Sequence, residues 1–429
     1  MYSKLPYFHF LVSSGHYYAS SLYICFYKTD YMKIIHTSDW HLGQEFYSYD
    51  RNEEHNAFLL QLRDIVAEEQ PDVLIVSGDI YHNATPSNTV MRLFTDRLDQ
   101  VRQASPGMQI VVIAGNHDSA TRLEISSSVW SHLNVHIIGR IERNENDEID
   151  FRRHIIPIGE KGYVVALPHV FPQNYPLIEA DTPREERQAV FHRYMDNVVK
   201  EVNKDGKPVV VAAHLAVSGS NTEGHDLLRG NMDFVDAAEL GLCYDYLALG
   251  HIHCPQNING YPARYCGTPI PVSFDENYSH SVSIVRIETA GAVPEIRTVK
   301  IDNPWSLRTL PEEAVPFEKA IASLMDMPDD EKCYVRLNVR IEHHTPADAM
   351  EQAHNAVKGK AARFCCFKWE QEKSESIATR QMLDVEQIKQ LSPVDVAEMY
   401  YQETTGEELD VELKNMLANI VEQIDQNRL

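Results

Sequence analysis

The sequence predicts an α/β protein in which buried strands alternate with amphipathic helices. Five apolar runs of strand length recur along the chain, at residues 33–38, 72–77, 109–114, 208–213 and 246–249. Continuous apolar runs of this length are typical of strands that are covered on both faces. Helical patterns lie between them, for example at residues 53–69 and 89–102. This alternation indicates a sheet packed against helices.

Each of the five runs ends in polar side chains that can bind a metal ion. The endings are Asp39-Trp40-His41, Gly78-Asp79, Gly115-Asn116-His117-Asp118, His214 and Gly250-His251-Ile252-His253. Open α/β sheets place their sites beyond the carboxyl ends of strands, so we expect these groups at one rim of the sheet. A single histidine near a strand is more often structural, and the chain has 20 histidines. Five such endings together favour a metal centre over coincidence.

The composition is that of an ordinary globular chain with a strong acidic balance. With 429 residues, 43% hydrophobic and 24% charged, the chain is long enough for two or three domains. Seven cysteines without a CxxC pair fit reduced thiols in the cytoplasm. The net charge of −24 argues against a broadly basic surface that coats nucleic acid, although metal ions and a local basic rim can still hold a phosphate. No Walker A loop or GxSxG elbow occurs, which argues against ATP binding by that route and against that type of serine hydrolase.

Residues 1–31 precede the first apolar run and are rich in Tyr and Phe. His9 and His16 interrupt any stretch that could span a lipid bilayer. The basic start and clean apolar core of a signal peptide are also missing. We therefore expect no membrane association, and we interpret residues 1–31 as an upstream start-site artefact or a poorly ordered tail.

The central part of the chain completes a first domain, which we place at residues 32–303. Residues 140–171 contain short β-like runs and charged turns, and they lead into a predicted helix at residues 184–203. Prolines close behind a glycine indicate a rigid turn within residues 265–275. Residues 281–287 then read as a further strand.

A second, smaller α+β domain is predicted at residues 304–376. Residues 333–342 alternate strictly between apolar and polar, which is typical of a half-buried strand. A helix beginning near Pro346 and a strand at residues 363–369 complete the unit. Its end is the most basic part of the chain, with Lys358, Lys360, Arg363 and Lys368. This basic cluster is either a solvated face or a contact to DNA.

The last segment, residues 380–429, is predicted to be helical. Ser392, Pro393 and Asp395 form a helix-capping signature. Further on, apolar residues follow helical spacing and form a stripe of Leu413, Met416, Leu417, Ile420, Val421 and Ile424. Such a stripe usually packs on its own domain. Because this one follows a completed unit, we expect a partner protein to cover it.

The order of the strand endings, DxH, GD, GNHD, H and GHxH, resembles the calcineurin-like metallophosphoesterase superfamily. The resemblance implies a β-sandwich flanked by helices, with two divalent metal ions at the strand ends. The seven matching ligands are Asp39, His41 and His253 for one ion, Asn116, His214 and His251 for the other, and Asp79 as a bridge. Oxygen and imidazole donors of this kind suit manganese, iron, zinc or magnesium.

His117 and His82 are the candidate catalytic residues. His117 follows a ligand without being needed as one, so it is free to orient the phosphate or to protonate the leaving oxygen. It also matches the catalytic histidine of the family. His82 lies three residues after Asp79 and matches the archaeal pattern of the family. The alternative for His82 is an ordinary loop histidine.

Longer segments sharpen the resemblance. Residues 32–43, 114–119, 248–253 and 265–276 resemble the SbcD family, the nuclease subunits of bacterial SbcCD complexes. The resemblance implies Mn²⁺ as the metal, a cap that contacts DNA, and C-terminal helices that bind the coiled-coil ATPase SbcC, with a homodimer inside a heterotetramer. It also implies ATP-dependent 3′→5′ exonuclease activity on duplex DNA and endonuclease activity on single strands and hairpins, in DNA repair and recombination.

Two alternatives stay open at this point. A phosphatase or cyclic-nucleotide phosphodiesterase has the same motifs and needs no partner, and the acidic composition slightly favours it. A scaffold that kept the fold and lost its metals is the second alternative. The complete ligand set argues against the scaffold, and an assay of metal content distinguishes it.

Overall fold

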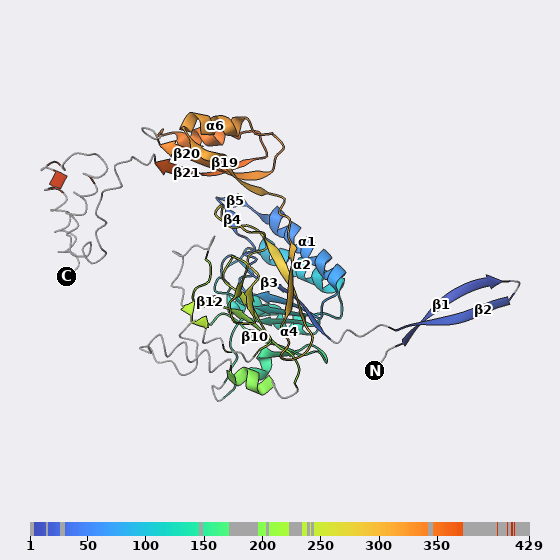
Figure 1. Cartoon of the computed structure of the whole chain (residues 1–429). Helices are drawn as coiled ribbons and strands as arrows, with labels where there is room; N and C mark the ends of the chain where they lie inside the picture. Colours follow the sequence, from blue (N-terminus) through green and yellow to red (C-terminus); the bar gives the residue numbers. More distant parts are fainter. Residues whose placement is uncertain are drawn as a thin grey trace. The chain divides into compact units, whose positions relative to one another are not determined.

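The computed structural model divides into two compact units, Met1–Glu370 and Gln371–Leu429 (Figure 1). In the first unit it describes residues 4–13, 16–25, 31–145, 149–170, 196–202, 206–222, 234–237, 241, 244–341 and 346–370. In the second it describes residues 371, 401, 410, 413, 414 and 416. No helix among these residues is both long enough and apolar enough to cross a bilayer.

Two six-stranded sheets form the centre of the first unit. The first sheet has the order β18 (Glu295–Lys300), β17 (Ser281–Ile287), β3 (Met32–Thr37), β6 (Val73–Ser77), β7 (Gln109–Ile113) and β8 (Val135–Ile138). The second has the order β15 (Gln256–Ile258), β16 (Ala263–Tyr265), β14 (Tyr246–Gly250), β11 (Val209–His214), β10 (Tyr163–Leu167) and β9 (Ile155–Pro157). In the first sheet, β3, β6, β7 and β8 run parallel to one another. In the second sheet, the four central strands β16, β14, β11 and β10 are parallel. Their carboxyl ends therefore share a rim within each sheet.

The alternation of side chains along each strand explains why these runs are apolar throughout. In β3, Ile34 packs in the core between the two sheets, whereas its neighbour Ile35 packs in the core under the helices. The core between the sheets also contains Val111 of the first sheet and Ala212 of the second. Each sheet is thus covered on both faces, and the predicted sandwich flanked by helices is confirmed.

Helices cover the outer faces of both sheets. On the first sheet lie α1 (Asn52–Glu69), α2 (Asn88–Ala104), α3 (Ala120–Leu123), η1 (Glu124–Ser126) and α4 (Ser127–Ser131). The bounds of α1 and α2 agree closely with the predicted helices at 53–69 and 89–102. Of the helix predicted at residues 184–203, only residues 196–202 are described, and they are helical. Val198 and Val202 pack there in the outer core of the second sheet.

The predicted α+β cap has a core of its own. It consists of β19 (Ser306–Val315), α6 (Phe317–Met325), β20 (Cys333–Ile341), α7 (Ala349–Ala356) and β21 (Arg363–Gln371), with the sheet order β19-β20-β21. The half-buried character predicted for β20 is wrong at two positions, because Tyr334 and Asn338 of its polar face are also buried. Tyr334 is buried because its hydroxyl donates to Glu54 of α1, across the junction between the cap and the first domain.

Short elements complete the described chain. They are β1 (Lys4–Ser13), β2 (His16–Cys25), β4 (Glu45–Phe46), β5 (Tyr49–Asp50), η2 (Phe151–His154), β12 (Ala216–Val217) and β13 (Phe234–Val235). Within residues 1–31, the structure describes the antiparallel hairpin β1–β2. Its many aromatic residues favour extended backbone. The capping signature at 392–395 and most of the apolar stripe lie outside the described residues.

Candidate metal centre

The structure brings all seven predicted ligands to one rim, from both sheets. Asp39 and His41 follow β3, Asp79 follows β6, Asn116 follows β7, His214 ends β11, and His251 and His253 follow β14. The two sheets approach each other closely here. A Cβ atom on Gly250 would collide with the carbonyl oxygen of Ser77, so only glycine fits at the end of β14. The convergence of two sheets is what assembles a single centre from five strand ends.

Four of these ligands have an unusual backbone conformation. The φ angles of Asp39, His41, Asp79 and His251 are 53°, 44°, 51° and 97°. Non-glycine residues in this left-handed region are strained, and such strain gathers at functional sites. The sharp turns reverse the chain just past each strand, which aims successive side chains at the same point.

The first predicted ligand group is closely assembled. The Nε2 atoms of His41 and His253 lie 3.3 Å apart, and Asp39 has a carboxylate oxygen within reach of both. When one of these nitrogens carries a proton, it can donate a hydrogen bond to the other. The same spacing also lets both nitrogens bind one cation, because imidazole nitrogens are good ligands for divalent metals.

The second group meets around Asn116. Its Oδ1 atom lies 2.9 Å from Nε2 of His214 and 2.9 Å from Nδ1 of His251. Asp79 lies between the two groups, because its Oδ2 atom is 3.7 Å from His41 Nε2 and 3.5 Å from His214 Nε2. This position is the one that a bridging carboxylate needs.

Hydrogen bonds set the ring orientation of two histidines. Nδ1 of His214 donates to the carbonyl oxygen of Ser77 at 2.8 Å, and Nδ1 of His117 donates to the carbonyl oxygen of His82 at 2.8 Å. A carbonyl oxygen can only accept, so both Nδ1 atoms carry the proton. In the neutral ring, Nε2 of His214 then carries a lone pair that faces the acceptor Oδ1 of Asn116, and a metal ion bound by both atoms would remove this conflict. Nε2 of His117 is left for a substrate.

The charges of the centre call for a cation. Burial, and next the Asp79 carboxylate, raise the pKa of Asp39 well above its ordinary value. Burial, and next His253, lower the pKa of His41, so this imidazole is neutral. Buried carboxylates that repel one another, together with neutral imidazoles, form the donor set that divalent ions bind in proteins. The residues present thus fit two divalent metal ions.

Three positioning residues were not predicted. The Asp118 carboxylate accepts hydrogen bonds from the backbone N–H groups of Gly115 at 2.8 Å, Tyr81 at 2.9 Å and Ile80 at 3.1 Å, which ties two ligand loops together. Burial, and next Asp79, raise the pKa of Asp118 to about 7. Its place in the GNHD motif was the available sequence signal.

The other two are Ser38 and His169. The Ser38 hydroxyl donates to the Asp39 carboxylate, so it helps to hold that ligand. His169 comes from the insert at residues 140–171, and its ring lies 5.9 Å from that of His214 and 6.5 Å from that of His251. The sequence offers no signal for His169, because the insert has no pattern that predicts where it returns to the rim.

The two candidate catalytic histidines lie together beside the first ligand group. The rings of His82 and His117 are stacked at 5.7 Å, and the ring of His117 lies 5.0 Å from that of His41. The backbone N–H of His117 donates to Oδ1 of Asp79 at 2.9 Å. Both rings are partly exposed, so a substrate can reach them.

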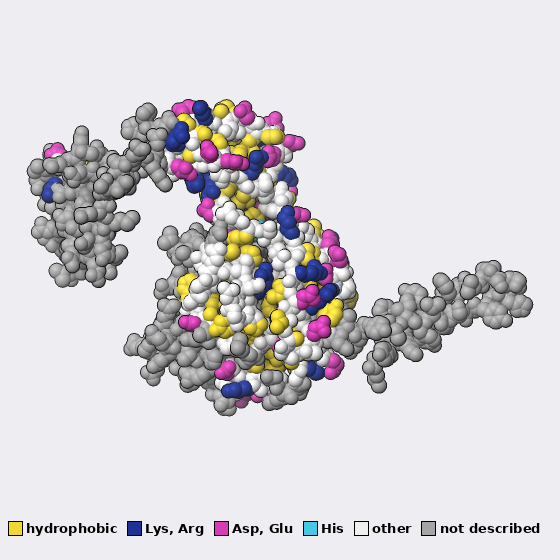
Figure 2. Space-filling view, in the orientation of Figure 1, with side chains coloured by type: hydrophobic (Ala, Val, Ile, Leu, Met, Phe, Trp, Pro, Cys, Tyr) yellow, Lys and Arg dark blue, Asp and Glu magenta, His cyan; other side chains and the backbone are white. Residues whose placement is uncertain are grey.

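The predicted basic cluster of the cap is largely engaged within the protein. Lys360 pairs with Asp329 at 2.9 Å, Lys368 pairs with Glu370 at 3.1 Å, and the Arg363 guanidinium lies 3.9 Å from the ring centre of Trp305. On the face shown in Figure 2, basic and acidic side chains are interspersed over the described part of the chain. Three of the four basic side chains thus have partners within the protein.

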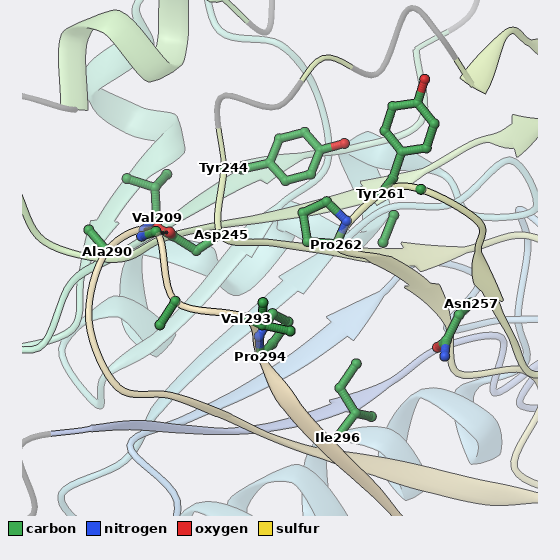
Figure 3. Close-up of a pocket in the computed structure, with 14 residues that line it drawn as sticks. Val209, Tyr244, Asp245, Asn257, Tyr261, Pro262, Ala290, Val293, Pro294 and Ile296 are labelled. Carbon is green, nitrogen blue, oxygen red and sulfur yellow. Dashed lines mark hydrogen bonds between the residues drawn. The ribbon is translucent and has the colours of Figure 1, made fainter.

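A separate pocket of about 700 Å³ lies at the opposite ends of the strands (Figure 3). Val209 at the start of β11 and Ala263 at the start of β16 line it, with Tyr244, Tyr261 and Val293. These positions are the amino ends of strands whose carboxyl ends approach the metal centre. The pocket is thus distinct from that centre.

Comparisons with known proteins agree with this geometry. Residues 32–255 match the calcineurin-like phosphoesterase family, and residues 305–405 match a family described as the type 5 capsule protein repressor C-terminal domain. The chain is similar to SbcD of the SbcCD nuclease from Rhodobacter capsulatus, with 32% identity over 70% of this chain and 77% of that protein.

Two further SbcD relatives cover more of the chain. The protein of Escherichia coli K12 is 26% identical over 91% of this chain and 96% of its own length. The protein of Bacillus subtilis 168 is 27% identical over 92% of this chain and all of its own length. The chain therefore belongs to the calcineurin-like phosphoesterase family and, within it, to the SbcD nucleases, which makes it a metal-dependent phosphodiesterase.

Proposed function

We propose that this protein is the nuclease subunit of a complex with an SbcC-type ATPase, and that it cleaves DNA with two metal ions, Mn²⁺ in the cell. The observation that carries the proposal is the convergence of seven ligand-type residues at one rim, in a chain with SbcD relatives along more than nine-tenths of its length. The proposed activities are ATP-dependent 3′→5′ exonuclease on duplex DNA and endonuclease on single strands and hairpins. The setting is DNA repair, recombination and replication in the cytoplasm.

The roles of the residues follow from their positions. Asp39, His41 and His253 would hold one ion, and Asn116, His214 and His251 the other, with Asp79 shared. When bound, such ions neutralise charge on a phosphate and activate a water molecule. His117 presents Nε2 beside this centre, and when the ring is doubly protonated this N–H can bind a phosphate oxygen or give its proton to the leaving oxygen. His82 stacks on His117 and supports the orientation of its ring.

We propose three functional parts along the chain: a nuclease domain at 32–303, a capping domain at 304–376 and a partner-binding segment at 380–429. The separate apolar core of the cap supports the first boundary. Leu413 and Met416, the two described members of the C-terminal stripe, are 47% and 58% exposed. Exposed apolar side chains at helical spacing fit a surface that a partner covers.

A second exposed apolar surface supports a homodimer. Ile125, Val129 and Leu133 are 81%, 65% and 39% exposed, and they recur every four residues along η1, α4 and the turn that follows. This segment comes directly after the GNHD motif. Two copies of the chain that meet here would place their metal centres in one assembly.

The dimer is tested by the double variant Ile125→Glu with Val129→Glu. Light scattering after gel filtration is expected to show a monomer that keeps its metal. The matched control is Val293→Glu, which places the same charge at a 92% exposed valine near the separate pocket. A wild-type monomer, or a dimer that survives both substitutions, contradicts this surface as the interface.

The function is tested with plasmid, linear duplex and hairpin DNA, in Mn²⁺ or Mg²⁺, with and without ATP and the partner ATPase. We expect cleavage of single strands and hairpins by the chain alone, and degradation of duplex ends only with ATP and the partner. Truncation from residue 382 should abolish co-purification with the ATPase while metal content stays unchanged. Hydrolysis of small phosphate esters without any cleavage of DNA would instead support the phosphatase alternative.

A further inference from the structure

The hairpin β4–β5 begins four residues after the ligand His41 and has a strained turn. Its two turn residues, Tyr47 and Ser48, have φ angles of 50° and 68°. Two positive φ angles define the turn type that normally requires Asn-Gly. A tyrosine and a serine are costly there, and such strain persists where the surroundings over-determine it. The turn therefore holds Tyr47 in a place that local stability alone would not select.

The hairpin is rigid because both of its ends are anchored. At its start, the N–H of Gln44 donates to the carbonyl oxygen of His41 at 2.9 Å. At its end, Arg51 donates to the side chain of Gln44 at 2.7 Å and forms a fully buried ion pair with Glu54 at 2.8 Å. The hairpin is thus fixed to the loop that carries a metal ligand.

The ring of Tyr47 is held in place but not covered. It lies 5.0 Å from the ring of Phe46 and 5.8 Å from that of Phe274. Tyr47 nevertheless remains 48% exposed. The nearby Tyr49 has a structural role instead. Its hydroxyl donates to the carbonyl oxygen of Phe364 at 2.9 Å, and its side chain is less exposed than that of Tyr47. Tyr49 already joins the hairpin to the cap.

The ring behind Tyr47 is itself supported. The Arg336 guanidinium lies 5.1 Å from the ring centre of Phe274 and pairs with Asp275 at 2.7 Å, so it holds Phe274 in place. Aromatic rings that are exposed on one face bind unpaired nucleotides, because a base can stack on the ring. A rigid ring also binds without losing freedom of its own.

We propose that Tyr47, backed by Phe274, is a stacking site for an unpaired nucleobase on the hairpin that follows the ligand His41. The inference rests on the proposed function, because it takes single-stranded or hairpin DNA as the substrate. Tyr47 would be the residue by which the protein selects unpaired over paired DNA. A base that stacks on Tyr47 is removed from its own helix, so the site favours strands that are already open.

The test compares Tyr47→Phe with Tyr47→Leu by fluorescence anisotropy in EDTA, where cleavage cannot occur. Phenylalanine keeps the flat ring and should bind single strands and hairpins like the wild type. Leucine keeps apolar bulk on the same backbone and should weaken that binding by about 5- to 150-fold, the usual loss for one stacked base. Binding to blunt duplex should change much less, and the melting temperatures of the two variants should agree. The fluorescence of 2-aminopurine in a hairpin loop should be quenched by the wild type but not by the leucine variant.

The control is Tyr261→Leu, at the separate pocket, which should leave all binding unchanged. Equal binding of single strands by the phenylalanine and leucine variants overturns the stacking site. Equal losses on duplex and single-stranded DNA also overturn it, because Tyr47 would then contact only the backbone. If the wild type binds and cleaves DNA while either of these results is found, the proposed function stands and only the stacking site fails. If the wild type neither binds nor cleaves DNA, the proposed function fails as well.

Discussion

The substitution Asp79→Asn should stabilise the metal-free protein while it destroys the metal centre. Asp79, Asp39 and Asp118 are buried together, and the Asp79 charge contributes to the raised pKa values of the other two. The rise in the pKa of Asp118 from its ordinary 3.8 to about 7 corresponds to about 4 kcal/mol in all, with burial as the larger cause, so removal of the Asp79 charge should stabilise the metal-free variant by a part of this amount. Asparagine keeps the Oδ1 atom that accepts the N–H of His117, so little packing is lost.

The response to metal should change in the opposite direction. At a concentration of Mn²⁺ 100 times the dissociation constant, one bound ion stabilises the wild type by about 2.7 kcal/mol. The variant lacks the shared carboxylate and should lose most of this gain at both positions. Thermal unfolding should therefore be measured for both proteins at pH 8. In EDTA the variant should melt at a higher temperature than the wild type, and in Mn²⁺ it should melt at a lower temperature than the wild type. Metal content and nuclease activity should fall together.

The matched control is Asp330→Asn, which removes an exposed carboxylate of the cap and should change neither measurement. Two results would refute the reasoning. A variant that still binds two ions shows that Asp79 is not shared. A metal-free variant less stable than the wild type shows that the buried carboxylates do not repel one another as the structure indicates.

Three further predictions follow from the same geometry. His117→Ala should keep metal content and DNA affinity, while turnover falls by about 10²–10⁴-fold, since a positioned acid–base group is lost; release of a metal would make His117 a ligand instead. Gly250→Ala should reduce the stabilisation by Mn²⁺ in thermal unfolding, because the added Cβ pushes apart the strand ends that form the centre; an unchanged response contradicts the close approach. Lowering the pH from 7 to 5.5 should cost about 2–3 kcal/mol of stability through His36 and His55 together, since burial lowers the pKa of both to about 3 while the unfolded chain takes up these protons below about pH 6.5. Urea unfolding at both pH values should show this loss as the difference between the wild type and the double variant His36→Asn with His55→Asn; equal pH dependence in the two proteins contradicts it.

Local patterns in the sequence were sufficient for the strands that lead into the metal centre, for α1 and α2, and for the convergence of the ligand-type residues at one rim. Strand-length apolar runs indicate backbone that is covered on both faces, and ligand-type residues at their carboxyl ends are brought together by parallel pairing. That rule needs no knowledge of distant contacts. It explains why residues as far apart in the chain as Asp39 and His253 could be assigned to one site before the fold was known.

Only the tertiary structure decided which groups hold the ligands in place and what surrounds them. The N–H of His251 donates to Asp39, which is 212 residues away in the chain, and Asp118 links the loops after β6 and β7. His169 reaches the centre from the insert at residues 140–171, whose sequence has no pattern that predicts this position. The strained turn at Tyr47 could not be predicted either, because a Tyr-Ser pair carries no turn signal and the conformation is imposed by contacts at both ends. Periodicity reports the burial of a residue within its own strand or helix. Contacts between distant segments depend on how those elements pack, and no local pattern contains that information.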